Sequence, residues 1–547
     1  MTALSAIIAM MSSRARLVLL AALCAGALLV GVELMITAVA LPRIVVDLAD
    51  WTQLRRASWI VNGYLLAYIA MMPLAGRLGD RYGIPRLFML SLALFGIGSA
   101  LSGMAPTLDA LIGARIIQGL GAGAILPLAT AGASHLYDGH LRARALGVVG
   151  AATFLGMALG PFLGASVLEL YDLGAALDKA QAAPGLKEVL GASWRWVFYL
   201  SVPFSIIALS WVWAVSPSWA VERAPGRLDA LGAALWTGAL AAGLVALTAL
   251  GETQLEGSLP VPLVAGALCA IAGAAAILHA LRTPDPFLDP RLFGNRVFSG
   301  AMLLSLLTGY ALATAIVGAA VFVDRVRYAG PEEQRVVLGS LALAMAIGAL
   351  GSGFLLRRVG IVPLSLVGIV LSTTGLVTLG LSGPTTDLPV LLTGLALFGL
   401  GFGLTVTPRS SAAVEALGRR AFGMASAGVT VARMAGMAIG LAVLTGFGTS
   451  RIEALSVVLV DAIARDAVLP IPLRGRPLVD PQVVGALEAW ASAEAGAILG
   501  GLFLVAALVM LLGIAPTLLM RDASSRDGRA TMRGDDDADG VQPAFSL

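Results

Sequence analysis

Apolar runs of about 20 residues recur along the chain and constrain its fold more than any other feature. A helical run of roughly that length spans the hydrocarbon core of a bilayer. Charged residues make up only 13% of the 547 residues, against roughly 25% in a soluble protein. We therefore predict an all-α polytopic membrane protein with fourteen transmembrane helices. The runs lie near residues 17–41, 58–78, 86–105, 108–130, 142–168, 196–214, 228–250, 260–282, 297–323, 334–357, 361–382, 388–412, 422–447 and 497–520.

The positions of Lys and Arg predict the orientation. With the N-terminus in the cytoplasm, cytoplasmic segments hold 21 of the 36 Lys and Arg residues and the outer loops hold 13, as the positive-inside rule requires. We expect a multi-pass protein of the inner (cytoplasmic) membrane with both termini in the cytoplasm. The first run follows Arg14 and Arg16, which is also typical of a signal peptide, but no convincing small-residue cleavage site follows it.

The pattern excludes several classes of activity. Lys179 and Lys187 are the only lysines and neither follows a glycine, so the chain lacks a Walker A loop. The three histidines are scattered without metal-ligand spacing. We expect no metal, cofactor or nucleic-acid partner, and we expect transport to draw on a proton gradient. The alternative class, a membrane-bound sensor or enzyme, would need a catalytic constellation or a soluble signalling domain, and the sequence shows neither.

A short segment recurs in the two halves of the chain. Gly76-Arg-Leu-Gly-Asp-Arg-Tyr-Gly83 has a degraded copy at Gly353-Phe-Leu-Leu-Arg-Arg-Val-Gly360, and each lies between the second and third spans of its half. Chance similarity of short Gly- and Arg-rich loops is the alternative. Transporters built from two such halves hold substrate between them. The predicted organisation is a six-helix bundle at 1–215, two inserted helices at 216–290, a second six-helix bundle at 291–520 with a long outer loop at 450–495, and a disordered cytoplasmic tail at 521–547.

The first copy has the composition of a gate. We expect Asp80 to pair with Arg81 or Arg86, or to lie at a helix N-terminus, where negative charge is stabilised. The alternative is a solvated loop that only sets topology. Arg357 stands in the second copy where Asp80 stands in the first, so we expect a stronger latch in the first half. The residues of this gate motif are Gly76, Asp80, Arg81, Gly83 and Arg86.

These segments resemble known family signatures. The gate motif resembles G-x-L-x-D-R-x-G of the major facilitator superfamily, and 111–123 resembles its fourth-helix motif. The segment 156–165 resembles the fifth-helix antiporter motif, through Gly156, Gly160, Pro161 and Gly164. The segments 32–42 and 194–198 are similar to first- and sixth-helix motifs of the fourteen-helix drug:proton antiporter family, the EmrB/QacA-like group. The resemblance implies the major facilitator fold and proton-driven export of hydrophobic or amphipathic drugs by alternating access.

A second resemblance concerns the cargo. The segments 58–73 and 431–440 are similar to the actinobacterial branch that exports triacylglycerol lipids beside a lipid-carrying lipoprotein. It implies, as the alternative function, lipid export toward the outer surface with an extracytoplasmic lipoprotein as partner. That branch carries a glutamate in its fifth-helix motif, and the matching residue here is Phe154, which has no proton to give.

Three charged residues within spans are the candidates for proton coupling. A charge at the centre of a span costs at least about 2.5 kcal/mol and is functional by default. We hypothesise that Glu33 loads and releases a proton and that Arg115 and Arg433 set its proton affinity. The alternatives are a static buried ion pair and an arginine tied to carbonyls. Asp324, at the outer end of a span, is a second candidate, although such a residue is more often interfacial.

Aromatic, methionine and polar residues in the spans are the candidates for the substrate cavity. Aromatic and methionine side chains form large, adaptable apolar surfaces. Each residue has plain packing or interfacial anchoring as its alternative. We expect a monomer that accepts bulky hydrophobic or lipid cargo from the bilayer. The predicted lining is Thr37, Trp59, Asn62, Tyr64, Tyr68, Gln118 and Met437.

Overall fold

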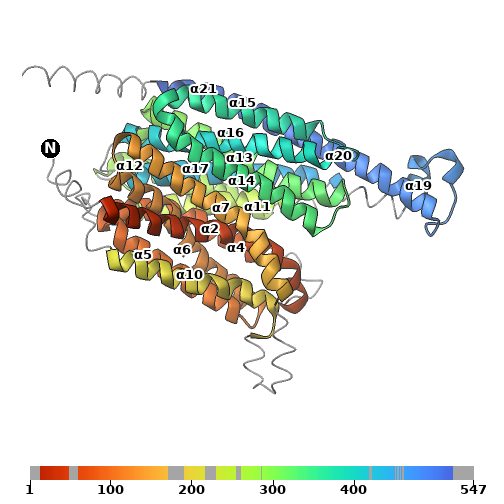
Figure 1. The fold of residues 1–547 in the computed structure, drawn as a ribbon, viewed down its shortest axis with the longest axis horizontal. Coiled ribbons are helices and arrows are strands. Elements are labelled where there is room, and N and C mark those ends of the chain that lie inside the picture. Colours follow the sequence, from red (N-terminus) through yellow and green to blue (C-terminus); the bar gives the residue numbers. More distant parts are fainter. Residues whose placement is uncertain are drawn as a thin grey trace, which may run out of the picture.

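The computed structural model describes residues 13–48, 59–170, 190–215, 229–253, 260–284, 286–417, 422–449, 451, 452, 455, 458 and 461–521. These residues contain fourteen helices long and apolar enough to cross a membrane and no strand. The helices lie side by side along one common direction (Figure 1). The predicted all-α polytopic fold is therefore confirmed.

Twelve of the fourteen long helices form two sets of six, and the other two lie between the sets in the chain. The first set is α2 (Ser13–Leu48), α4 (Trp59–Tyr82), α5 (Ile84–Met104), α6 (Leu108–Leu136), α7 (Gly139–Leu170) and α10 (Ser193–Val215). The intervening pair is α11 (Ala230–Thr253) and α12 (Pro260–Arg282). The second set is α13 (Arg296–Arg325), α14 (Pro331–Val359), α15 (Ile361–Gly380), α16 (Leu388–Leu417), α17 (Phe422–Val443) and α20 (Pro481–Leu512).

Five short elements complete the described chain. They are η3 (Pro290–Gly294), the π-helix η5 (Leu444–Thr449), α19 (Ala462–Val468), η6 (Ile471–Leu473) and α21 (Ile514–Leu519).

Helices pair in the same way within both sets. The first helix packs on the fifth (α2 on α7, α13 on α17), and the second packs on the fourth (α4 on α6, α14 on α16). The third packs on the fourth and on the sixth (α5 on α6 and α10, α15 on α16 and α20). Across the sets, the second helix of each contacts the fifth helix of the other (α4 with α17, α14 with α7). The repeat seen in the sequence thus has a counterpart in the packing.

Glycines mark both crossings between the sets. A Cβ on Gly76 of α4 would lie 2.5 Å from the carbonyl oxygen of Gly423 in α17, and one on Gly353 of α14 would lie 2.8 Å from that of Ala143 in α7. Helices approach this closely in a bilayer when the side chains at the contact are small. Both crossings lie near the end of the bundle that holds the turns at Gly83 and Gly360, which we call the Asp80 end.

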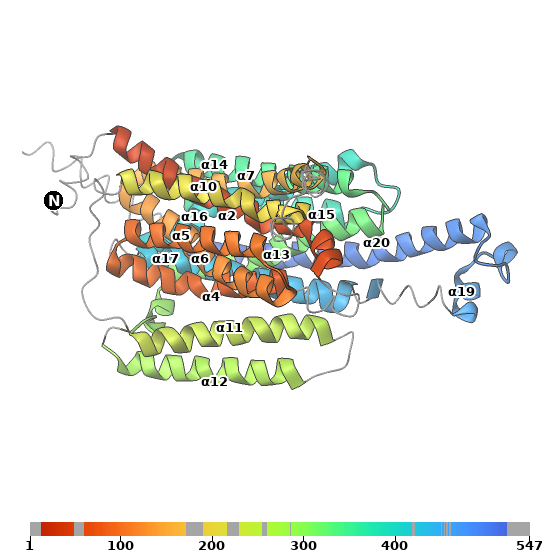
Figure 2. The same ribbon diagram turned by 90° about the horizontal axis from the view of Figure 1, so that it is seen from below.

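The intervening helices cover one flank. α11 packs on α4, α17 and η5, while α12 packs on α11 and η3. Figure 2 shows α12 outermost on this flank, with α11 between it and α4. Asp229 ties the pair together, because its carboxylate accepts the N–H groups of Gly232 (2.8 Å) and Phe287 (3.0 Å) and bonds to Nε2 of His279 in α12 (2.8 Å). Desolvation raises the pKa of Asp229, but these hydrogen bonds outweigh it and lower that pKa below its ordinary value.

The last helix of the second set is longer than the sequence predicts. We placed a loop at 450–495 and a span from 497, but α20 begins at Pro481, where Asp480 caps it by accepting the N–H of Gln482 at 2.9 Å. Its 32 residues extend about 48 Å at 1.5 Å per residue, beyond a core of about 30 Å. The predicted start of this helix was wrong because the apolar run ends at Glu494. A helix that continues out of the membrane can carry a charged residue there.

The part of α20 near Pro481 and the short helix α19 project beyond the ends of the other helices (Figure 1). We call this the α19 end. Leu469, Val483 and Leu487 form a small apolar cluster there. Within the first part of the predicted outer loop 450–495, residues 451, 452, 455 and 458 are described, and the continuous description resumes at Asp461, which caps α19. Residues 171–189 lie outside the described chain, and of the predicted tail only Arg521 is described.

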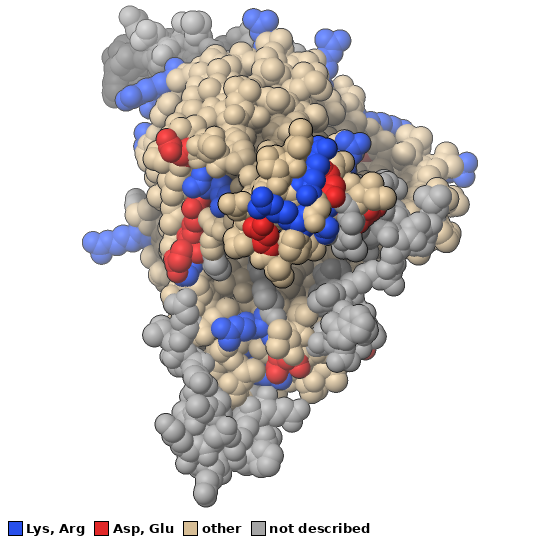
Figure 3. Space-filling model, turned by 90° about the vertical axis from the view of Figure 1, so that its right-hand side faces the viewer, with Lys and Arg blue, Asp and Glu red and all other residues tan. Residues whose placement is uncertain are grey.

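Charged side chains are plentiful at the α19 end. Figure 3 looks onto this end and shows acidic and basic side chains next to each other. Several of them form ion pairs. Arg327 pairs with Glu333, and Arg476 with Asp480 at 3.2 Å.

Candidate functional site

A buried ion pair lies at the centre of the first set. Glu33 of α2 and Arg115 of α6 are 0% and 1% exposed, and a guanidinium nitrogen of Arg115 contacts Oε1 of Glu33. The hydroxyl of Thr37 donates to the same oxygen at 3.1 Å, and that of Ser201 in α10 donates to Oε2 at 3.2 Å. Both carboxylate oxygens therefore have donors, as a buried charge requires.

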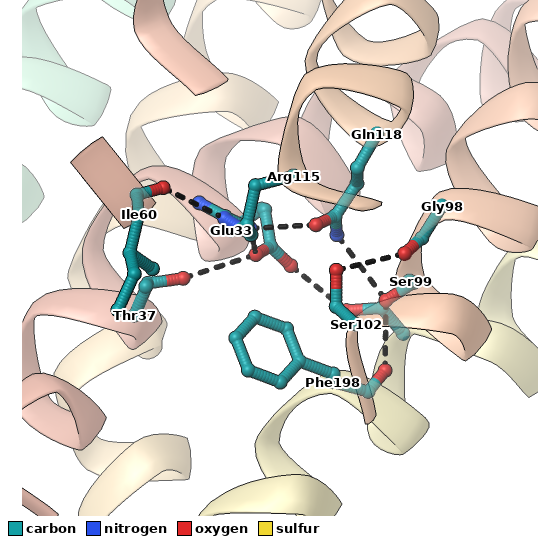
Figure 4. Close-up of polar contacts among 10 residues, drawn as sticks. Glu33, Thr37, Ile60, Gly98, Ser99, Ser102, Arg115, Gln118 and Phe198 are labelled. Carbon is teal, nitrogen blue, oxygen red and sulfur yellow. Dashed lines mark hydrogen bonds and ion pairs between the residues drawn. The ribbon is translucent and has the colours of Figure 1, made fainter. Parts of the chain in front are cut away.

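Arg115 connects this pair to further helices. Its Nε donates to the carbonyl of Ile60 in α4 at 3.2 Å, and its Nη1 donates to Oε1 of Gln118 at 2.6 Å. The guanidinium lies over the ring of Tyr64, 4.2 Å from its centre. Figure 4 shows how the residues of α2, α4, α5, α6 and α10 converge on the pair.

Gln118 continues the network toward α5 and α10. Its amide nitrogen donates to the hydroxyl of Ser99 at 3.2 Å, and that hydroxyl donates to the carbonyl of Phe198 at 2.8 Å (Figure 4). The structure therefore brings together five of the predicted site residues, Glu33, Arg115, Thr37, Gln118 and Tyr64. A proton on Glu33 would remove the negative charge that balances Arg115.

The fifth-helix motif supports the helix that carries Glu33. A Cβ on Gly156 would lie 2.1 Å from the carbonyl oxygen of Leu28, and one on Gly160 would lie 2.8 Å from that of Val32. Gly164 faces Ile36, and Pro161 lies inside α7. The motif therefore packs α7 tightly against α2 on both sides of Glu33.

Arg433 does not lie beside the ion pair of Glu33 and Arg115. Among the described residues it forms no ion pair with Glu33, and it lines a pocket between the two sets instead. This pocket is framed by α6 and α7 of the first set and by α16 and α17 of the second. Its lining is Leu126, Thr130, Leu146, Val149, Gly150, Thr153, Phe154, Val406, Arg409, Ser410, Val429, Thr430 and Arg433.

Arg409 is a site residue that the sequence analysis missed. It is 1% exposed, its Nε donates to the carbonyl of Thr405 at 3.0 Å, and its Nη1 contacts the hydroxyl of Thr308 in α13. We counted it with the cytoplasmic loops because it lies close to the end of the run 388–412. An arginine inside an apolar run was the signal that could have found it.

The predicted substrate lining is not the lining of this pocket. Thr37, Tyr64, Tyr68 and Gln118 are buried within the first set, and Trp59, Asn62 and Met437 are half-buried. A second pocket, between α2, α7, α13 and α14, is lined by other residues, three of them methionines: Met35, Met157, Ile316, Leu338, Leu341, Ala342 and Met345.

The gate motif makes a contact between the sets. Asp80, 3% exposed, accepts the backbone N–H groups of Gly423 (2.8 Å) and Met424 (3.0 Å) at the start of α17. In the described structure it forms no ion pair with Arg81 or Arg86, so the expected helix N-terminus is its partner. The turn at Gly83 of this motif needs a glycine, because its φ is 96°.

Two other candidates stay outside the site. Asp324 is exposed and pairs with Arg325 at 3.0 Å, which fits the interfacial alternative. No group of three or more His, Cys, Asp or Glu side chains placed to hold a metal occurs among the described residues.

Known proteins agree with this architecture. Residues 23–441 match the model of the Major Facilitator Superfamily. A triacylglyceride transporter of Mycolicibacterium smegmatis is 33% identical over 524 residues, covering 91% of this chain and 87% of that protein. One of Mycolicibacterium hassiacum is 35% identical over 415 residues, covering 73% of each chain.

Solved structures of low sequence identity share the fold. The proton:xylose symporter XylE superposes with a TM-score of 0.54 at 15% identity, covering 92% of this chain and 96% of its own. A bacterial homologue of the lysosomal transporter Spinster gives 0.57 at 18% identity, covering 93% and 99%. The chain therefore belongs to the Major Facilitator Superfamily, as a membrane transporter and not an enzyme, in the branch that contains the mycobacterial triacylglyceride transporters.

Proposed function

We propose that this transporter exports lipids of low polarity, such as triacylglycerol, by alternating access. The observation that carries the proposal is the likeness to relatives named triacylglyceride transporters, which reaches 33% identity over 91% of the chain. The pocket between the sets supports it, since its walls are mostly apolar and come from both sets. The contact of Asp80 with α17 would close one end of the path and open in the other half of the cycle.

We further propose that a proton gradient drives the cycle through Glu33. The support is geometric, because Glu33 is fully buried and its charge is balanced by Arg115. Arg433 lines another pocket and is no longer part of this hypothesis. We propose the cytoplasmic membrane as the location, with the Asp80 end facing the cytoplasm.

Export of hydrophobic drugs is the second candidate. The close packing of Gly156 and Gly160 against α2 supports it, because this is the motif that resembles the antiporter signature. This observation concerns the direction of transport more than the cargo. We therefore place lipid export first.

One experiment separates the two candidates. Cells lacking the protein would be compared with cells carrying the wild type or Glu33→Gln for retained lipids and for retained dyes, with and without a proton uncoupler. We expect neutral lipid to accumulate in the deletion strain, in the Glu33→Gln strain and in uncoupled wild-type cells. Accumulation of dye with unchanged lipid content would replace lipid export with drug efflux.

A further inference from the structure

Two arginines line the pocket between the sets without a carboxylate beside them. Arg409 comes from α16 and Arg433 from α17, and both line this one pocket. None of the residues that line this pocket is acidic. The contrast with Arg115 is direct, because Arg115 is balanced by Glu33 at the same degree of burial as Arg409.

A buried cation without a counter-ion is costly. Removing one partner from a buried ion pair typically costs several kcal/mol, because the remaining charge has neither water nor an opposite charge around it. Arg409 recovers part of that cost through the carbonyl of Thr405 and the hydroxyl of Thr308. Arg433 is less well satisfied, since its Nε is buried and has no hydrogen-bond partner. The pocket therefore has unused capacity to bind an anion.

The other polar groups of the pocket do not compete for that role. The hydroxyls of Thr130, Thr153, Ser410 and Thr430 all donate to carbonyls of their own helices. Hydroxyls used in this way have no proton left to give to a ligand. The donors available in the pocket are the guanidinium N–H groups, which fit carboxylate and phosphate oxygens in pairs.

The remaining wall is apolar. Phe154 of α7 stacks edge-on against Phe402 at 5.7 Å between ring centres, and the guanidinium of Arg409 lies 5.3 Å from the centre of the same Phe402 ring. Leucine and valine side chains cover the rest of the wall. The chemistry that fits is an oxyanion on an apolar chain, since the arginines would bind the head and the apolar wall would contact the chain.

We infer that Arg409 and Arg433 bind the carboxylate or phosphate head of an amphipathic lipid between the two sets. This inference rests on the proposed function and extends it, because triacylglycerol has no anionic head: lipids with an anionic head would be a second class of cargo beside lipids of low polarity. The arginines belong to the second set, whereas Phe154 and the threonines of α6 and α7 belong to the first. A ligand held this way would contact both sets, which is what a substrate of an alternating-access transporter must do.

The test measures binding without transport. Purified full-length protein would be stripped of lipid and offered four probes, namely dioleoyl phosphatidate, oleate, dioleoylglycerol and inorganic phosphate, with occupancy read by native mass spectrometry. We expect phosphatidate and oleate to bind at least about tenfold more tightly than dioleoylglycerol, since hydrogen bonds to charged groups are worth about 1.5–3 kcal/mol. Equal binding of the neutral and anionic lipids would overturn the inference.

Variants locate the site. Arg433→Gln should reduce the preference for the anionic lipids about tenfold or more, whereas Arg358→Gln, an exposed arginine of α14, should leave it unchanged. Phe154→Glu places a carboxylate in the pocket and should suppress the preference, while Phe154→Gln should retain it. The two Phe154 variants test the same pocket without a substitution of Arg409, which is buried and whose loss could prevent folding. An undiminished preference in both Arg433→Gln and Phe154→Glu would contradict the assignment.

The phosphate probe shows whether the bound anion is a lipid head or free phosphate. The accumulation assay tests the proposed function independently of binding. Inorganic phosphate binding as tightly as phosphatidate would overturn the lipid assignment, whereas weak binding of phosphate would support it. Lipid accumulation in the deletion strain tests the proposed export and uses no binding data. An anionic preference without lipid accumulation would leave this inference standing and reject lipid export.

Discussion

The carboxylate of Asp80 in α4 accepts the backbone N–H of Gly423 in α17 at 2.8 Å. This contact places a negative charge at a helix N-terminus, where the helix dipole stabilises it. At the equivalent crossing of α14 with α7, the corresponding residue is Arg357, which is exposed. One crossing at the Asp80 end is therefore stabilised by a charge and two hydrogen bonds. The other is stabilised by close packing and by the guanidinium of Arg144 in α7, which lies 5.2 Å from the centre of the Phe354 ring in α14.

Asp80→Asn should loosen the Asp80 end. The substitution removes the charge–dipole contribution of about 0.3–2 kcal/mol, so the open population should rise roughly twofold to thirtyfold. Spin labels on Tyr82 and Glu415, both exposed near this end, would report the distance distribution between the sets. Arg357→Gln is the matched control and should leave the distribution as in the wild type. A wild-type distribution in Asp80→Asn would show that this contact is not a latch.

Gly353→Ala should destabilise the protein and Gly351→Ala should not. A Cβ at 353 would lie 2.8 Å from the carbonyl oxygen of Ala143, whereas one at 351 meets nothing within 4 Å. We expect Gly353→Ala to cost about 1–3 kcal/mol, while Gly351→Ala is neutral or gains up to about 1 kcal/mol from helix propensity. Thermal unfolding midpoints in one detergent would compare them. Equal midpoints for the two variants would argue against close packing at this crossing.

Glu33→Gln should abolish proton-driven export. The variant leaves Arg115 buried without a counter-charge, and breaking such a pair costs about 3–5 kcal/mol. Two assays in proteoliposomes separate coupling from folding, namely uphill export under an imposed pH gradient and substrate counterflow without one. We expect counterflow to persist and uphill export to disappear. Asp324→Asn, which alters an exposed ion pair, is the control, and uphill export by Glu33→Gln would exclude Glu33 as the coupling residue.

Asp229 should make the pairing of α11 with α12 sensitive to acid. The pKa of Asp229 is lower in the folded protein than its ordinary value, which is about 3.9 in an unfolded chain. A lowered carboxyl pKa stabilises the fold above the unfolded value, and this contribution is lost as the pH falls through the folded value. The difference between the unfolding midpoints of wild type and Asp229→Asn should therefore stay constant from about pH 6 to about pH 4 and shrink as the pH falls further, toward the lowered pKa. A difference that remains constant below about pH 4 would show that the charge of Asp229 does not stabilise the fold.

Local sequence rules located the spans and singled out both residues of the central ion pair. The hydrocarbon thickness fixes the length of a span, so the apolar runs located all fourteen helices to within a few residues at most ends. Glu33 and Arg115 were found because a charged residue inside a span is costly, is usually paired and is functional by default.

Local sequence rules could not predict the contacts between the two sets of helices. Asp80 and Gly423 lie 343 residues apart in the chain, and only the packing of α4 on α17 brings them together. The sequence placed Arg433 within a span but gave no information on which pocket its helix face would meet. Arg409 and the early start of α20 were missed for a related reason, because both lie where an apolar run ends and the helix continues.

The length of α20 has a mechanical consequence. The helix is continuous from Pro481 to Leu512, packs on α13 and α15, and is tied near its middle by the hydroxyl of Ser492, which donates to the carbonyl of Val326. The projecting part therefore moves as a lever arm of the second set. From Ser492 to Pro481 the arm measures about 17 Å at 1.5 Å per residue, so a rotation of about 10° about Ser492 would move its tip by about 3 Å, and a fluorophore attached there would report that movement.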